Sequence, residues 1–397
     1  MKLRSYPSAA AISAAVLCAA LLGAALLFAE RADTSRRPRY GGILRVEIGA
    51  VIHSLDPAGT TVDPEETAAK DEIGALLYEQ RNADGTFAGV AGSGAFHIAQ
   101  WESGKRLTLT ANENYRGGRA FVDSIEIEMG RPAKDRLVDL EVGTADFAEI
   151  PPEEARRASE RGVRVSASKP QELVALAFVP GHPASEDAHV REALSRSIDR
   201  ATIVNFILQK EAQPAGGLLP QWSNGTAFLF PTAADPLGAK AIWSQIAGSP
   251  RIALGYDSGD SLGQAIAERV AVNARDAGIA LSTEAIPAGQ AGATPAASFD
   301  VRIVRLPMKS VRPRDSLAGF IDLLAPSAGI DASQLSATAS AEQIYSRERD
   351  IVSSNRVIPI VWLPRVYGLG SRLRDWKAPE AGEGWPLADV WLEQESQ

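Results

Sequence analysis

Short segments of alternating apolar and polar residues are separated along this chain by segments with the 3.6-residue period of amphipathic helices. The first pattern predicts strands, for example at Leu44–Ile48 and Val122–Met129. The second pattern predicts helices, for example at Glu65–Tyr78. Residues 251–283 combine the two into a strand–helix–strand unit, so the pattern predicts an α/β protein.

The same periods locate most of the remaining elements. Further strands are predicted at Phe96–Ala99, Leu107–Thr110, Leu173–Val179, Phe299–Val304 and Val357–Leu363. Further helices are predicted at Pro132–Val142, Pro151–Arg161, Leu262–Ala277 and Ser340–Ser353. Ala325–Ala341 is rich in alanine and serine and is predicted to form a loop.

The most informative segment runs from Asp187 to Arg200. Its apolar residues have helical spacing, and Asp199 is predicted to cap a second helix. The segment reads D-A-H-V-R-E-A-L-S-R-S-I-D-R and is similar to one shared by the family 5 extracellular solute-binding proteins. Tyr40–Val46, Ser54–Pro57 and the segments 92–96, 112–118 and 387–392 also resemble that family, in the same order. Its members are the oligopeptide-, dipeptide- and nickel-type receptors of ABC importers.

The resemblance implies a type II periplasmic-binding-protein fold, in which two α/β lobes are joined by two hinge crossings. Lobe I is expected over residues 40–180, with 364–397 returning to it, and lobe II over 181–363. The crossings are expected at Leu173–Val179 and Val357–Leu363. A chain of 397 residues is long enough for two such domains.

The sequence departs from the family in lobe I. In the family, a helix like the one ending at Tyr78 leads into an inserted subdomain of roughly a hundred residues, the size of a small domain. Here Gln80–Ala91 takes the place of that insert and has the composition of a loop. We expect the insert to be missing and Glu79 to lie close to Gly92.

A second departure concerns the ligand site of lobe II. Peptide-binding relatives place a Trp, and three residues later an Asp that pairs with the amine of the ligand. Leu306 and Lys309 occupy the matching positions, and Arg305 adds another positive charge. A lysine repels an amine, so an anionic or neutral solute is expected if this loop faces the cleft. If the alignment is shifted by a few residues, Asp315 is the nearest downstream carboxylate.

Four other residues are candidates for ligand contact. Thr61 and Asp63 lie in a loop that matches a ligand-facing loop of the peptide-binding relatives. Phe178 and Trp362 lie on the two predicted hinge crossings, where an aromatic ring either forms a wall of the cleft or packs into the core. Five other aromatic residues are expected to pack within lobe I: Trp101, Tyr115, Trp376, Trp385 and Trp391.

The first 29 residues are predicted to be a targeting segment. Lys2 and Arg4 precede an uncharged run, Ala9–Ala29, that suits a long signal peptide or a retained membrane anchor. Residues 30–39 are polar and are expected to be a linker. Cys18, the single cysteine, follows Leu17 rather than the small residue that lipidation requires. We therefore expect an exported protein, in the periplasm or on the outer face of the cytoplasmic membrane.

Composition and motifs exclude several other classes of protein. Without Lys2 and Arg4 the exported part has 39 basic and 49 acidic residues, a net charge of −10, which does not suit nucleic-acid binding. Gly259–Gly263 matches the G-x-S-x-G pattern of serine hydrolases around Ser261. The expected order places the catalytic histidine after the serine, but all histidines precede it: His53, His97, His182 and His189.

Gly259–Gly263 is therefore predicted to be the start of a helix, and a serine hydrolase that uses Ser261 is only a remote alternative. His182 and His189 lack the spacing of helix-borne metal ligands, so no metal, cofactor or catalytic residue is predicted.

The predicted function is capture of a peptide-like or other small solute by lobe closure, followed by delivery to ABC permease subunits. The alternative is an envelope-anchored sensory or interaction module that kept the fold and lost transport.

Overall fold

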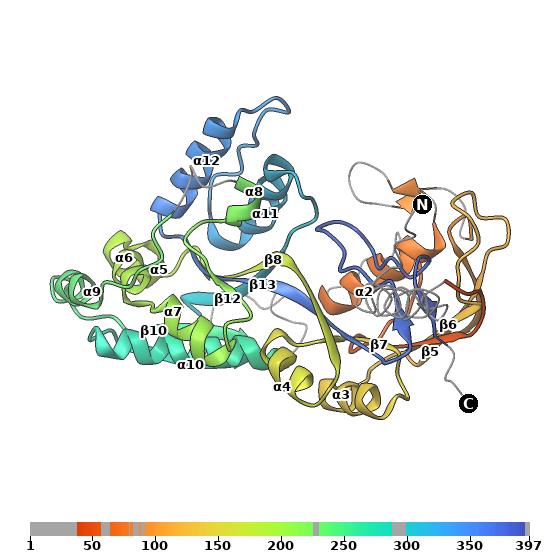
Figure 1. Ribbon diagram of the computed structural model, residues 1–397. Coiled ribbons are helices and arrows are strands. Elements are labelled where there is room, and N and C mark those ends of the chain that lie inside the picture. Colours follow the sequence, from red (N-terminus) through yellow and green to blue (C-terminus); the bar gives the residue numbers. More distant parts are fainter. Residues whose placement is uncertain are drawn as a thin grey trace, which may run out of the picture.

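The computed structural model describes residues 38–56, 64–78, 80–81, 87–88, 92–224, 230–287 and 299–393. Thr61, Asp63 and the targeting segment lie outside these ranges. Among the described residues, one 11-stranded sheet runs through the molecule in the order β11-β10-β12-β8-β13-β7-β1-β6-β5-β4, with β9 paired to β13. Figure 1 shows two halves that are connected by the long strands β8, Arg164–Phe178, and β13, Val357–Leu369.

Lobe I forms the half that contains the N-terminal strands. Its central strand, β1 (Ile43–Glu47), pairs in parallel with β6 (Ser124–Glu128) and β7 (Phe147–Ile150). The antiparallel strands β5 (Arg106–Ala111) and β4 (Phe96–Glu102) extend the sheet to its edge. The remaining elements are α2 (Pro64–Leu77), the β2–β3 pair (Gln80–Arg81, Phe87–Ala88), α3 (Ala133–Val142), a 3₁₀ turn (Pro152–Glu154), α4 (Ala155–Glu160) and the β14–β15 pair (Leu373–Arg374, Trp391–Leu392).

Lobe II is built on the other half of the sheet. There β10 (Ile252–Asp257) lies between β11 (Leu281–Ile286) and β12 (Val301–Pro307), parallel to both. Figure 1 shows α10 (Ser261–Asp276) on one face of this half, and α11 (Pro313–Ala328) and α12 (Ala341–Ser353) on the other. The smaller elements are α5 (Pro183–Glu186), α6 (Ala188–Ser197), α7 (Arg200–Thr202), a π-helix (Ile203–Ile207), β9 (Gln213–Pro214), α8 (Gln221–Asn224) and α9 (Pro236–Trp243).

The prediction that the two hinge segments run side by side is confirmed. β8 and β13 are antiparallel, and their pairing extends from Ala177 opposite Val357 to Arg164 opposite Leu369. Both strands are longer than the predicted segments Leu173–Val179 and Val357–Leu363. Beyond these apolar segments the two strands continue into lobe I, where they still pair with each other. The lobe boundaries at 180/181 and 363/364 remain a prediction.

The predicted Asp199 cap is present, and the structure shows a second cap, Asp260, that was not predicted. The carboxylate of Asp199 accepts a hydrogen bond from the Thr202 amide at 3.0 Å, and Asp260 caps α10 by accepting one from Gly263 at 3.0 Å. Ser261 is therefore the first residue of a capped helix, as predicted. The apolar stripe of α6 is fully buried.

Several helices were not predicted, and the longest of them is α11. α11 spans Pro313–Ala328, so the segment predicted to be a loop at Ala325–Ala341 begins inside this helix. Pro326 interrupts the helical signal near its end, although Phe320 and its apolar neighbours are buried against lobe II. Gly329, with φ at 62°, then ends the helix in the left-handed conformation.

The ends of the expected deletion lie against each other. The carbonyl oxygen of Leu77 accepts hydrogen bonds from the amides of Gly92, at 2.8 Å, and Gly94, at 3.0 Å. Glu79 itself lies outside the described residues, so its distance from Gly92 stays a prediction, although Leu77, two positions earlier, contacts Gly92 directly. Within the described part of the chain, no helix combines the length and apolar character needed to cross a bilayer.

Candidate functional site

A cavity of about 360 Å³ lies between the two lobes. The crossing strand β8 contributes Ser166–Lys169 and Gln171, lobe II contributes Trp222, and the C-terminal segment of lobe I contributes Lys377–Ala381. Small-molecule sites commonly have volumes of roughly 300–1,000 Å³ and lie between domains. This cavity, called the interlobe cavity below, therefore has both the position and the size of a ligand site.

Direct contacts join the strand β8, lobe II and the C-terminal segment beside this cavity. Lys169 Nζ pairs with Glu380 Oε1 at 2.9 Å, and the same ammonium lies over the ring of Trp222, 5.3 Å from its centroid. The Trp222 indole nitrogen donates a hydrogen bond to the Pro170 carbonyl at 2.7 Å. Ala381 belongs to lobe I in sequence but is buried in the lobe II core with Leu306 and Met308. A separation of the lobes would have to break this packing.

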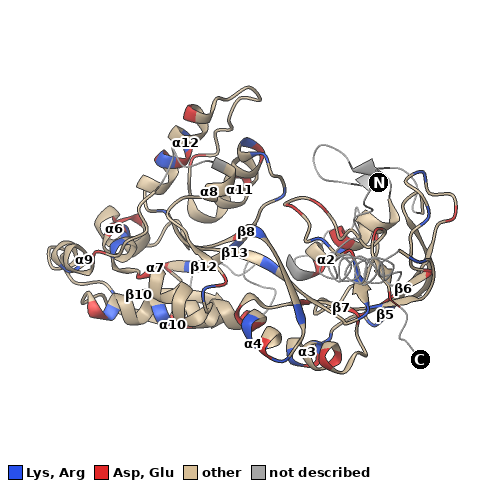
Figure 2. Ribbon diagram, viewed as in Figure 1, with Lys and Arg blue, Asp and Glu red and all other residues tan. Residues whose placement is uncertain are grey.

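A largely buried ionic cluster is connected to the cavity wall through Ser168. Arg365 of β13 pairs with Glu72 of α2 and with Glu149 of β7, and its backbone amide donates a hydrogen bond to Ser168 Oγ at 3.0 Å. The Trp385 amide donates to Glu72 Oε2 at 2.7 Å. Figure 2 shows basic positions on both β8 and β13 where the strands cross between the lobes. The cluster thus connects the hinge strand β13 to α2 and β7 of lobe I.

The charge state of this cluster is sensitive to its burial. Burial raises the pKa of Glu72 to about 7, with Arg365 acting in the opposite direction and Glu149 in the same direction. Burial alone would lower the pKa of Arg365, but Glu149 and Glu72 outweigh this effect and raise it. Burial also raises the pKa of Tyr367, so its hydroxyl stays protonated as a donor. The cluster thus holds a permanent cation beside a carboxyl group that titrates near neutral pH.

Three buried aromatic donors have no hydrogen-bond partner among the described residues. They are the Tyr367 hydroxyl and the indole nitrogens of Trp376 and Trp362. Tyr367 and Trp376 pack edge to face with their centroids 5.0 Å apart. Buried donors without partners are uncommon in folded proteins, but none of these three residues lines the interlobe cavity.

The aromatic candidates from the sequence lie in the cores. Phe178 is fully buried in the lobe II core with Val174 and Leu176, which corresponds to the core alternative stated above. Trp362 is 3% exposed and packs on Phe320 in the lobe II core, with ring centroids 6.2 Å apart, which again corresponds to the core alternative.

The charged candidates have different surroundings. Arg305 pairs with Glu172 at 2.7 Å and with Asp260 at 3.2 Å. Burial by itself lowers the pKa of Arg305, but these two carboxylates and Glu153 outweigh it and raise the pKa. Its charge is therefore already compensated. Lys309 is exposed, and its carbonyl oxygen lies against Gly382 of the C-terminal segment, at the junction of the lobes.

The downstream carboxylate Asp315 pairs with Arg312 at 2.9 Å and with Arg314 at 2.6 Å, at the start of α11. Both of its ion pairs are therefore formed within lobe II.

Two further sequence expectations concern histidine. His182 pairs with Asp300 at 3.6 Å and His189 with Asp187 at 3.4 Å. No group of three or more metal-ligating side chains occurs within the described ranges.

The residues that line the interlobe cavity were missed by sequence reasoning. Lys169, Trp222, Lys377 and Glu380 come from three distant segments, and no local pattern marks them. The only available signal was the change in composition after β13, where prolines and glycines follow a long apolar strand.

The aromatic residues that were predicted to pack within lobe I do lie in that lobe: Trp101, Tyr115, Trp376 and Trp385 contact its core, and Trp391 is buried.

Comparisons with known proteins agree with this architecture. The sequence model described as "Bacterial extracellular solute-binding proteins, family 5 Middle" matches residues 60–320. The structure of the ABC transporter substrate-binding protein CtaP from Listeria monocytogenes superimposes with a TM-score of 0.71 at 14% identity, over 90% of this chain and 100% of that one. The fold is thus that of the type II periplasmic binding proteins.

Two curated relatives show local similarity in sequence. The oligopeptide-binding protein AppA of Bacillus subtilis (strain 168) is 25% identical over 125 residues, which cover 31% of this chain and 23% of AppA. The probable D,D-dipeptide-binding periplasmic protein DdpA of Escherichia coli (strain K12) is 27% identical over 165 residues, 40% of this chain and 32% of DdpA. These matches span only about a quarter to a third of each relative. Both relatives are binding proteins rather than enzymes.

Proposed function

Because the chain belongs to family 5 of the bacterial extracellular solute-binding proteins, we propose that it captures a small or peptide-like solute outside the cytoplasmic membrane. Capture occurs by closure of the two lobes around the interlobe cavity, and the loaded protein delivers the solute to permease subunits of an ABC importer. The observation that carries this proposal is the cavity itself, whose lining combines both lobes and a hinge strand. Binding of this kind requires desolvation and hydrogen bonding but no nucleophile or cofactor.

A thermal-shift screen tests solute capture. The screen covers dipeptides, tripeptides, amino acids and small carboxylates. A ligand present at a hundred times its dissociation constant stabilises the folded protein by about 2.7 kcal/mol. Replacing Lys169 with Gln removes a charge from the cavity wall and should weaken the hit, whereas Lys240→Gln on α9 changes an exposed lysine away from the cavity. Equal weakening by both variants would place the ligand elsewhere.

The charges around the cavity support an anionic or neutral solute. Lys169 is paired with Glu380, which leaves Lys377 as a cation in the lining, and Lys309 is exposed at the nearby junction of the lobes. Replacing Lys309 with Asp should weaken anion binding and improve binding of amines by roughly one to a few kcal/mol, the range for a desolvated charge pair. Lys240→Asp is the matched control. An unchanged ligand preference in folded Lys309→Asp removes Lys309 from the site.

Export by residues 1–29 belongs to the same proposal, and fractionation tests it. Recovery in washed membranes supports a retained anchor, recovery in the periplasmic fraction supports cleavage, and full-length protein in the cytoplasm contradicts export.

The second candidate function is an envelope-anchored sensory or interaction module. The close contact between Leu77 and Gly92 favours it, because it leaves little space for the family's inserted subdomain. Solute uptake that depends on this gene would exclude the second candidate.

A further inference from the structure

A second cavity, of about 450 Å³, lies in lobe I at the outer ends of the hinge strands. The carboxyl ends of α3 and α4, the start of β8 and the turn after β13 form its wall, and we call it the arginine cavity. Its lining shares no residue with that of the interlobe cavity. The solute site proposed above therefore does not account for it.

The lining carries an excess of positive charge. Its four arginines are Arg161, Arg164, Arg372 and Arg374, and its only acidic residues are Glu141 and Asp146. This is a local net charge of +2 in a chain whose formal net charge is −8. This local excess of positive charge favours the binding of an anion.

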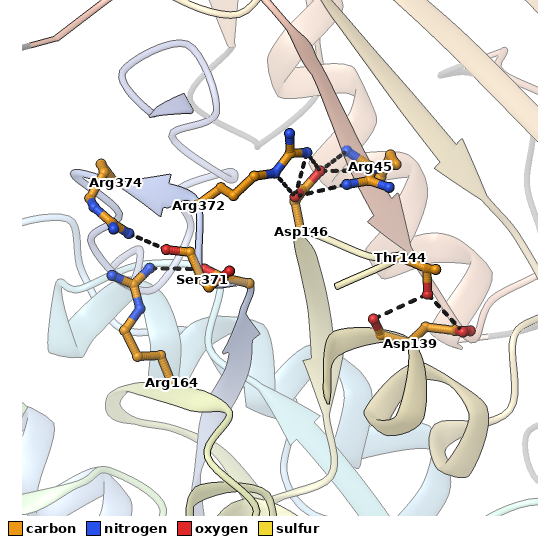
Figure 3. Close-up of polar contacts among 9 residues, drawn as sticks. Arg45, Asp139, Thr144, Asp146, Arg164, Ser371, Arg372 and Arg374 are labelled. Carbon is orange, nitrogen blue, oxygen red and sulfur yellow. Dashed lines mark hydrogen bonds and ion pairs between the residues drawn. The ribbon is translucent and has the colours of Figure 1, made fainter. Parts of the chain in front are cut away.

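The carboxylates beside the cavity are already engaged. Asp146 is 2% exposed and is shared between Arg372, at 3.0 Å, and Arg45, at 3.1 Å. Arg374 pairs with Glu393 at the edge of the cavity. Figure 3 shows Arg45 and Arg372 on either side of Asp146. One carboxylate thus serves two guanidinium groups and leaves part of their charge uncompensated.

Arg164 has no carboxylate partner among the described residues. Its guanidinium donates to the carbonyl oxygens of Gly370, at 3.3 Å, and Leu373. Burial lowers the pKa of Arg164, and the charge of Arg374 lowers it further, against a smaller opposite effect of Glu393. Figure 3 shows Arg164 and Arg374 both extending toward the turn at Ser371. Of these two neighbouring positive charges, only that of Arg374 has a carboxylate partner, Glu393.

We propose that the arginine cavity binds an organic phosphate, with Arg164, Arg372 and Arg374 contacting the phosphate oxygens. A phosphate monoester carries a charge of about −1.5 to −2 at neutral pH, which matches the +2 of the lining. Guanidinium groups bind phosphate oxygens in pairs of parallel hydrogen bonds. The cavity is larger than a phosphate ion requires and falls within the range of small-molecule sites, so the ligand carries an organic group.

The test measures binding of glycerol 3-phosphate to the full chain by calorimetry. Arg164→Gln and Arg374→Gln should each weaken binding about tenfold or more, the loss expected for one charge-assisted hydrogen bond. Arg156→Gln is the matched control, since Arg156 is an exposed arginine of α4 that pairs with Glu160 at 2.9 Å. Arg164→Lys retains the charge and should keep part of the affinity.

The remaining outcomes separate a ligand site from a structural role. Melting temperatures without ligand show whether a variant is folded, and the ligand-induced increase should disappear only in the cavity variants. Absence of saturable binding, or equal affinity in wild type, Arg164→Gln and Arg374→Gln, overturns the proposal. Glycerate binding as tight as glycerol 3-phosphate binding overturns the phosphate assignment.

Competition identifies the source of the phosphate. Phosphatidylglycerol vesicles that displace glycerol 3-phosphate, with phosphatidylcholine vesicles as the control, identify a lipid headgroup as the ligand. Failure of both kinds of vesicle to compete, with binding retained, identifies a soluble phosphate ester.

Discussion

Glu47, at the carboxyl end of β1, is a buried acid in an unfavourable environment. Its side chain lies 3.6 Å from Arg131, and one of its carboxyl oxygens has no hydrogen-bond partner among the described residues. Burial raises its pKa from 4.5 to about 7, with the charge of Asp139 adding to the effect and Arg131 opposing it. Between these two pH values the folded protein keeps a proton that the unfolded chain has released.

This residue predicts a specific pH dependence of stability. Because the folded state binds the extra proton, the contribution of Glu47 to the free energy of unfolding falls as the pH rises from about 4.5 to about 7 and is level on either side. Glu47→Gln should remove a decline on the order of 3 kcal/mol, measured by urea unfolding at a series of pH values. Glu160→Gln, at an exposed helix position, should leave the decline intact. Parallel profiles for wild type and Glu47→Gln would contradict the assignment.

Asp146 is the second residue that decides stability. It accepts hydrogen bonds from Arg45 and Arg372 and connects β1 to the turn after β13. Asp146→Asn keeps the volume but leaves two guanidinium groups without a counterion. We expect a loss of about 3–5 kcal/mol in the free energy of unfolding, as for other broken buried ion pairs. Glu128→Gln, which breaks an exposed pair with Arg106, should cost less than about 1 kcal/mol. Equal losses would contradict a structural role for Asp146.

At the scale of elements, the junction of α2 with β4 replaces the family's insert. A methyl group on Gly94 would lie 2.5 Å from the Leu76 carbonyl oxygen and 2.7 Å from the Leu77 carbonyl carbon, both backbone atoms that cannot move alone. We expect Gly94→Ala to reduce the free energy of unfolding by about 1–3 kcal/mol, measured by chemical denaturation. Gly319→Ala, in α11, meets no atom within 4 Å and should stabilise by roughly 0.5–1 kcal/mol. A neutral Gly94→Ala would mean that this junction is loosely packed.

At the scale of the molecule, the two lobes meet where Gly382 lies against the Lys309 carbonyl oxygen. Gly382 has φ at 85°, and a methyl group there would overlap this oxygen. Gly382→Ala should therefore separate the lobes, increase the radius of gyration in X-ray scattering and weaken solute binding. Gly248→Ala carries similar backbone strain, with φ at 78°, but has no neighbour within 4 Å and should scatter like the wild type. Identical curves for both variants would show that the contact does not hold the lobes together.

Local sequence determined the elements whose signals lie within a few residues. The apolar stripe of α6, the Asp199 cap, the helix start at Ser261 and the apolar cores of both hinge strands were all predicted, because periodicity and capping depend on neighbours along the chain. The ordered resemblance to family 5 added the two-lobed fold. It also supplied the expectation that the chain ends on either side of the missing insert would meet.

Tertiary structure alone decided which side chains share a site. The interlobe cavity combines β8, Trp222 and Lys377–Ala381, and the Arg372–Asp146 pair joins residues 226 positions apart. The full lengths of β8 and β13 also depended on partners contributed by both lobes. Burial and charge pairing are properties of neighbours in space, and for Phe178, Arg305 and Lys309 those neighbours belong to distant segments that no local pattern specifies.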